Sequence, residues 1–88
     1  MKVESDQDFK KLREQFSIWR KRFPMFTHDV NRIEHMIENR IQNHSIIMVQ
    51  HRQTKSRACL EKAQQEIDAI NQILSTVEKI ELMAMLAR

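Results

Sequence analysis

The chain has 88 residues, which is enough for one small domain and too few for two. Glycine is absent, proline occurs once, and hydrophobic and charged residues make up 41% and 31% of the sequence. Because glycine most readily forms tight hairpin turns and helix C-caps, its absence disfavours sheets and predicts an all-α fold. The same absence argues against dinucleotide-binding loops, Walker A loops and nucleophile elbows, which bring backbone close to a ligand.

Charge and cysteine content set weaker limits. Fifteen Lys and Arg against twelve Asp and Glu give a net charge of +3, which permits contact with nucleic acid without indicating it. Cys59 is the single cysteine, so it forms no intramolecular disulfide. The first residues turn acidic at once, unlike a signal peptide, and no apolar run reaches the roughly 20 residues of a membrane span. We expect a cytoplasmic or nuclear protein, and import without a cleaved presequence stays open.

The first predicted helix covers residues 6–22. Ser5 and Asp8 form a capping-box pattern at its start, and Pro24 ends it because the residue before a proline is pushed out of the helical region. Apolar residues recur at steps of three and four and so share one face. They are Phe9, Leu12, Phe16, Trp19 and Phe23.

Two further apolar stripes lie after Pro24. We expect Thr27 to cap the helix that carries the first stripe, with Asp29 near the positive end of its dipole. The first stripe consists of Phe26, Val30, Ile33, Ile37, Ile41 and Met48. The second stripe consists of Leu60, Ala63, Ile67, Ile70, Leu74 and Val77. The intervening segment 50–57 contains no apolar residue.

This polar segment leaves two architectures open. A continuous helix would lose its packing partner there for about two turns, and its two stripes would lie about 100° apart. We therefore favour an antiparallel hairpin, with helices over about 28–51 and 56–87. Against a hairpin, the segment lacks Gly, Pro, Asn and Asp, the usual turn residues. One long coiled-coil helix of about 90 Å is the alternative.

No pattern of side chains indicates catalysis or a metal site. His28 and His35, like His44 and His51, are spaced so that they lie about 10 Å apart along a helix, too far for one ion. Cys59 begins an apolar stripe, where a buried thiol is the commoner role. Carboxylate pairs occur only at helix-surface spacing and imply no cleft. We expect no enzyme, no cofactor, no metal ion and no small-molecule substrate.

Two basic clusters supply much of the positive charge. The candidate phosphate contacts are Arg20, Lys21, Arg22, Arg52, Lys55 and Arg57. The first three end a helix, where the dipole favours cations whether or not a ligand is present. The sequence contains no zinc finger, helix-turn-helix glycine or RNA-stacking aromatic set that would read bases. Nucleic-acid binding through phosphate contacts is the alternative function.

The segment 82–87 is apolar around the whole helix, so one packing face cannot cover it. A bundle of this size buries only about 60 to 65% of its chain surface, which leaves part of the segment exposed to water. Its methionines suit adaptable contacts with another protein. Glu78 and Glu81 flank the segment where a lipid-binding helix carries Lys or Arg, which argues against membrane docking.

These observations predict a non-enzymatic helical assembly or adaptor subunit. It would pair by coiled-coil packing with other helical subunits or with itself, because its apolar stripes exceed what one chain can bury. The expected partner-interface residues are Phe16, Trp19, Ile33, Ile37, Ile67, Ile70, Leu74, Leu82, Met83 and Leu86.

Overall fold

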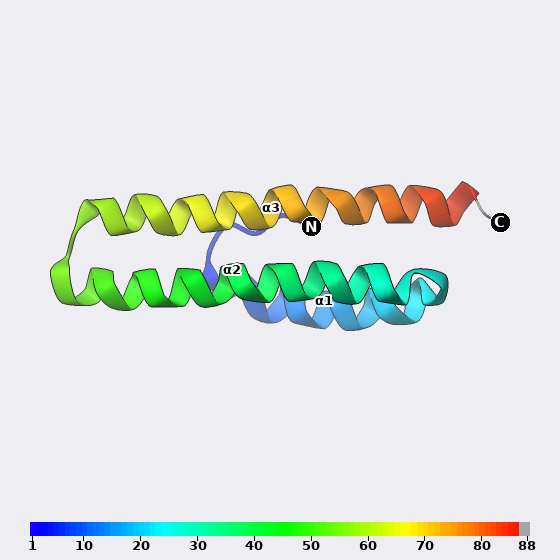
Figure 1. Cartoon of the computed structure of the whole chain (residues 1–88), viewed down its shortest axis with the longest axis horizontal. Coiled ribbons are helices and arrows are strands. Elements are labelled where there is room, and N and C mark those ends of the chain that lie inside the picture. Colours follow the sequence, from blue (N-terminus) through cyan, green and yellow to red (C-terminus); the bar gives the residue numbers. More distant parts are fainter. Residues whose placement is uncertain (87–88) are drawn as a thin grey trace.

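The computed structural model describes residues 1–86, which are almost entirely helical and contain no strand. In chain order the elements are the 3-10 turn η1 (Asp6–Asp8), α1 (Phe9–Arg22), the 3-10 turn η2 (Pro24–Phe26), α2 (Thr27–Thr54) and α3 (Arg57–Leu86). α2 and α3 run antiparallel as a long hairpin, and α1 packs chiefly against α2 (Figure 1). The prediction of a short helix, a proline corner and a helical hairpin is confirmed, and the single long rod is wrong. Residue 87, the predicted end of the third helix, lies outside the described residues.

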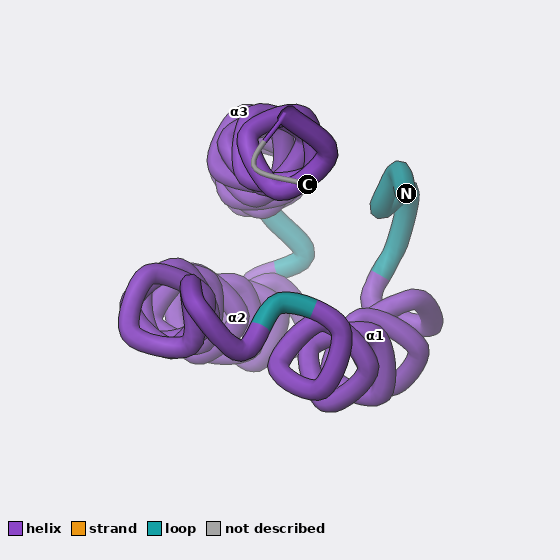
Figure 2. Tube along the Cα trace, turned by 90° about the vertical axis from the view of Figure 1, so that its right-hand side faces the viewer, coloured by secondary structure: helices purple, strands orange, loops and turns teal. Residues whose placement is uncertain are grey.

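The start of α1 is held by local hydrogen bonds and by a contact with α3. The Asp8 carboxylate accepts the backbone N–H groups of Glu4 at 2.9 Å and Ser5 at 3.3 Å, which is the acidic half of the expected capping pattern. Farther toward the N-terminus, the Asn71 side chain accepts the Val3 N–H and donates to the Val3 carbonyl, both at 2.8 Å. The N-terminal segment therefore crosses from α1 to α3 and closes the third side of the bundle (Figure 2).

The proline corner between α1 and α2 is short. Phe23 leaves the helix at φ −119° and ψ 64°, and its N–H donates to the Trp19 carbonyl at 2.8 Å. Thr27 is already the first residue of α2, and its hydroxyl donates to the Pro24 carbonyl at 3.0 Å. The expected N-cap role of Thr27 is wrong because η2 continues into α2 without a break, which moves the cap position to Phe26.

The hairpin turn is made by Lys55, which adopts the left-handed conformation with φ 52° and ψ 30°. Its N–H donates to the His51 carbonyl at 2.6 Å, and the His51 ring N–H donates from Nδ1 to the Ser56 carbonyl at 3.0 Å. The first bond satisfies a carbonyl group that the end of α2 would leave unpaired, and the second ties the end of α2 to the residue before α3. A lysine thus fills a position that usually takes glycine, at a conformational cost of about 1 to 2 kcal/mol.

The apolar stripes of all three helices form one core. Phe16, Leu12, Ile37 and Ile70 are among its fully buried side chains. His44 is the buried polar residue among those described, and its ring lies edge-on to Phe9 with 5.3 Å between the ring centres. Because Phe9 is the first residue of α1, the three-helix part of the molecule ends at the level of His44. Beyond it, α2 and α3 continue as a two-helix tip (Figure 1).

Ion pairs on the surface join the helices at three places in the part of the chain that the structure describes. Arg13 binds Glu38 through two hydrogen bonds, from Nε at 2.7 Å and from Nη2 at 3.1 Å, and this contact raises the pKa of Arg13. The other pairs are Arg20 with Glu34, between α1 and α2, and Arg40 with Glu66, between α2 and α3. Such exposed pairs contribute roughly 0 to 1 kcal/mol each, so the core supplies most of the stability.

Candidate helix-docking surface

The last two turns of α3 carry large apolar side chains that the rest of the chain leaves exposed. The exposed fractions are 57% for Leu82, 49% for Met83, 68% for Met85 and 77% for Leu86. Ile80, two residues before Leu82, is buried because it continues the core-facing stripe of α3. The following side chains surround the helix on all sides, and only Ala84 among them packs on the core. Ala87, the last residue of the predicted apolar segment, lies outside the described residues.

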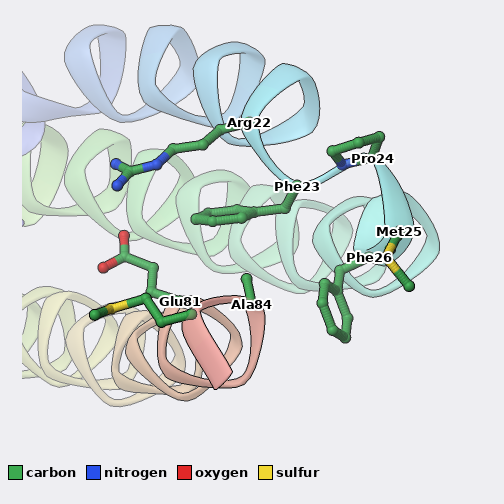
Figure 3. A pocket seen from close by; sticks show the side chains of 8 residues that line it. Arg22, Phe23, Pro24, Met25, Phe26, Glu81 and Ala84 are labelled. Carbon is green, nitrogen blue, oxygen red and sulfur yellow. The ribbon is translucent and has the colours of Figure 1, made fainter. Parts of the chain in front are cut away.

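A pocket of about 220 Å³ lies between this end of α3 and the proline corner (Figure 3). Phe23, Pro24 and Phe26 line it from the corner, and Ala84 and Met85 line it from α3. The corner places these side chains together because Pro24 ends α1 and the 3-10 turn then directs the chain into α2. The result is an apolar depression at the end of the bundle.

Two charged side chains frame this pocket. The guanidinium carbon of Arg22 lies 5.4 Å from the centre of the Phe23 ring, a cation–π contact. Arg22 on α1 and Glu81 on α3 extend toward each other from opposite walls (Figure 3). The pocket therefore combines an apolar floor with one basic and one acidic edge.

A groove of about 420 Å³ lies between α2 and α3, and no residue of α1 lines it. Its apolar walls are Ile33 and Met36 on α2 and Ile73, Ile80 and Met83 on α3. Met83 also belongs to the exposed end of α3, so the groove continues into that end. We call the four exposed side chains, the pocket and the groove together the C-terminal surface.

The structure divides the expected partner-interface residues into two groups. Leu82, Met83 and Leu86 are exposed on the C-terminal surface. The other seven have exposed fractions of 9% or less and lie in the core of the chain itself. They are Phe16, Trp19, Ile33, Ile37, Ile67, Ile70 and Leu74. Within the single chain these seven side chains are covered by its own helices, because α1 folds back onto the hairpin and the three stripes cover one another.

Sequence reasoning missed other residues of the C-terminal surface. Met25, exposed to 84%, and Phe26 lie at the corner, while Met36 and Ile73 line the groove. For Met25, the sequence contained one indication of exposure: it directly follows Pro24, where the chain reverses direction and side chains at the turn face the solvent. Met36 and Ile73 each neighbour a core position, so a helical stripe alone does not distinguish them from solvent-facing residues.

The six candidate phosphate contacts lie in two groups toward opposite ends of a molecule that is 52 Å long (Figure 1). In the group at the end of α1, Arg20 pairs with Glu34 at 2.8 Å, Arg22 contacts Phe23, and Lys21 is exposed. In the group at the hairpin turn, all three side chains are exposed; they are Arg52, Lys55 and Arg57. The fold therefore does not combine the two groups into one basic surface.

The other titratable candidates have structural contacts. Cys59 is half-buried, with its Sγ atom 4.0 Å from the Thr54 hydroxyl. His44 packs on Phe9, and His51 closes the hairpin turn. Within residues 1–86, no three His, Cys, Asp or Glu side chains gather as ligands for a metal ion. Over the same residues, no helix has the length and apolar character needed to cross a bilayer.

No family model, curated protein or solved structure matches this chain. The geometry and chemistry of the chain's own surfaces are therefore the basis for assigning its function.

Proposed function

We propose that this chain is a non-enzymatic helical assembly or adaptor subunit of the cytoplasm or nucleus. It joins other helical subunits, or a second copy of itself, through the C-terminal surface. The observation that supports this is the run of four large side chains with exposed fractions of 49 to 77% beside an apolar pocket and groove. Single exposed apolar side chains are ordinary, whereas a contiguous patch with polar residues at its edge is typical of an interaction site.

The four exposed side chains alone do not supply enough binding energy. Covering the exposed half of each contributes about 1 kcal/mol, or about 4 kcal/mol in total. Association costs about 4 to 15 kcal/mol in lost translational and rotational freedom, so the contact must extend beyond these four side chains. The pocket and the groove lie on either side of them and provide the remaining area.

An amphipathic helix fits this combination of features. Its apolar positions would lie on Leu82, Met83 and Leu86, in the helix-in-groove mode of recognition. The pocket would take one anchoring side chain from the partner. An aromatic side chain with a polar tip, Tyr or Trp, suits the apolar floor and the charged edges formed by Arg22 and Glu81.

Binding of nucleic acid is the second candidate function. Arg52, Lys55 and Arg57 favour it because all three are exposed on the projecting hairpin turn. With three phosphate contacts, a plot of the logarithm of the association constant for duplex DNA against the logarithm of the salt concentration would have a slope of about −3. Neutralising these three residues should abolish retention in a low-salt gel shift if this function is correct.

Site-specific photo-crosslinking in the host cell tests the main proposal. A photoreactive amino acid at Met83 should form adducts that mass spectrometry identifies as helical proteins or as this chain. The same amino acid at Gln72, an exposed position on α3 that lines neither the pocket nor the groove, is the matched control. Adducts that form equally at both positions, or that survive Leu82→Glu, would refute the proposal. The same amino acid at Lys55, in the hairpin turn, tests the second candidate, which nuclease-sensitive adducts at that position would support instead.

A further inference from the structure

The tip of the hairpin lacks the third helix that covers the rest of the bundle. α1 begins at Phe9, beside His44, and the residues before it turn away from the tip to bond Asn71 on α3. α2 continues from Ser45 to Thr54, about 15 Å of helix at 1.5 Å per residue. Over this length the face of the hairpin that α1 covers elsewhere is open.

Two adjoining hollows of about 450 and 210 Å³ occupy this open position. Asp6, His44 and Met48 line both of them, so the two hollows form one groove, which we call the tip groove. Val49 on α2 and Leu60 on α3 line its opposite sides, with exposed fractions of 49% and 45%. The tip groove therefore carries apolar side chains from both α2 and α3 and charged side chains along its α1 side, and the start of α1 closes one end.

Charge along the tip groove indicates which occupant fits. The side formed by α1 and α2 carries Lys10 and Arg52, beside Arg13, which is already paired with Glu38, and the closed end carries Glu4 and Asp6. Residues 45–60 contain three Lys or Arg and no Asp or Glu, a net charge of +3. Two copies packed tip to tip would bring these like charges together, which disfavours a second copy as the occupant.

We propose that the tip groove binds an acidic amphipathic helix of a partner protein, which takes the place of the absent third helix. Its apolar face packs on Met48, Val49 and Leu60, and its acidic side chains face Arg52 and the basic turn. The acids at the closed end favour the positive N-terminus of this helix, and the basic turn favours its negative C-terminus. The bound helix therefore runs parallel to α2. This site lies at the opposite end of the molecule from the C-terminal surface and is independent of it.

A displayed library of helical peptides tests this proposal with the full chain as target. Each peptide carries a fixed leucine stripe, and the flanking positions vary among Glu, Lys, Gln and Ser. We expect selection to enrich Glu at the flanking positions. For an enriched peptide, Val49→Gln and Arg52→Glu should each weaken binding about tenfold, the loss expected for one buried valine or one paired charge. A spin label at the peptide N-terminus should broaden the amide signals of residues 4–6.

Matched control variants test whether the loss of peptide binding is specific to the tip groove. Ile46→Gln and Lys62→Glu make similar changes at exposed positions outside the groove, and both should leave peptide binding unchanged. Leu82→Glu on the C-terminal surface should also leave it unchanged, so failure of this proposal is distinguishable from failure of the proposed function. The circular dichroism spectrum of each variant, compared with that of the unmodified chain, serves to check that the variant folds.

Three results would overturn the proposal. Selection without Glu enrichment, or peptide binding that Val49→Gln does not weaken, would remove the acidic helix as occupant. Dimerisation of the chain alone, measured by sedimentation and abolished by Val49→Gln, would assign the groove to a second copy. Stronger retention of the chain by duplex RNA, or by vesicles containing phosphatidylserine, than by any selected peptide would assign the tip to phosphate groups.

Discussion

Leu74→Ala measures how much of the fold's stability comes from the chain's own core. Leu74 is 5% exposed and belongs to the cluster that joins all three helices. The substitution removes three carbon atoms, each worth about 0.8 kcal/mol on burial, or about 2.4 kcal/mol in total. Leu74 also borders a hollow of about 130 Å³ next to Trp19, so the neighbouring side chains can relax and the cavity adds less than at a fully enclosed site. We expect a loss of about 3 kcal/mol in the free energy of unfolding.

Leu82→Ala is the matched control because it makes the same change on the same helix. Leu82 is 57% exposed, so we expect a loss of about 1 kcal/mol or less. Urea unfolding followed by circular dichroism, at a protein concentration low enough to prevent association, measures both variants. Equal losses would show that the end of α3 belongs to the intramolecular core, which would refute the burial pattern and with it the C-terminal surface.

Three further predictions concern the local contacts that fix the helices. Asn71→Ala removes both hydrogen bonds to Val3 and should cost about 1 to 2 kcal/mol, and unchanged hydrogen exchange at the Val3 amide would contradict this contact. Lys55→Gly should raise the free energy of unfolding by up to about 1 kcal/mol, because glycine adopts a positive φ without strain, whereas a loss of stability would mean that the turn has another conformation. The backbone N–H groups of Glu4 and Ser5 hold the pKa of the Asp8 carboxyl below its ordinary value of 3.8. Its stabilising effect should therefore be present above pH 3.8 and be lost as the pH falls through the lowered pKa, and an NMR titration of Asp8 that gives 3.8 or more would exclude these bonds.

Helical periodicity predicted most of the fold because burial follows the spacing of apolar residues. The stripe from Phe9 to Phe23 gave the buried face of α1, and Pro24 gave its end. The choice between a hairpin and a rod depended on Lys55, whose left-handed conformation has no signature in the sequence. The turn forms there because two hydrogen bonds compensate for a residue with no preference for this conformation: the Lys55 N–H donates to the His51 carbonyl, and the His51 ring donates to the Ser56 carbonyl.

The candidate site was harder to predict, since a stripe shows that a face is buried but not which molecule buries it. Phe16, Trp19 and Ile37 satisfy the same pattern whether α1 packs on its own hairpin or on a partner. Only the three-dimensional position of α1 decides between these cases. Leu82 and Met83 were predicted to be exposed for a different reason, because apolar residues on all sides of a helix exceed what one packing face can cover.

The unequal lengths of the helices explain why open surfaces occur at both ends of the molecule. α1 has 14 residues, whereas α2 and α3 have 28 and 30, so α1 covers only part of the hairpin. The two open ends differ in chemistry: methionine and leucine dominate at the end of α3, whereas the tip groove has basic residues along one side and acidic residues at its closed end. A chain that binds a different helix at each end would act as a spacer about as long as its 52 Å hairpin. The core holds α2 against α3 from Val30 to Ile41, and His44 and Ala63 continue the buried contact to the start of the tip groove, so the two sites would keep a fixed separation. Doubly labelled chains should therefore give the same distance between the ends whether one peptide or both are bound.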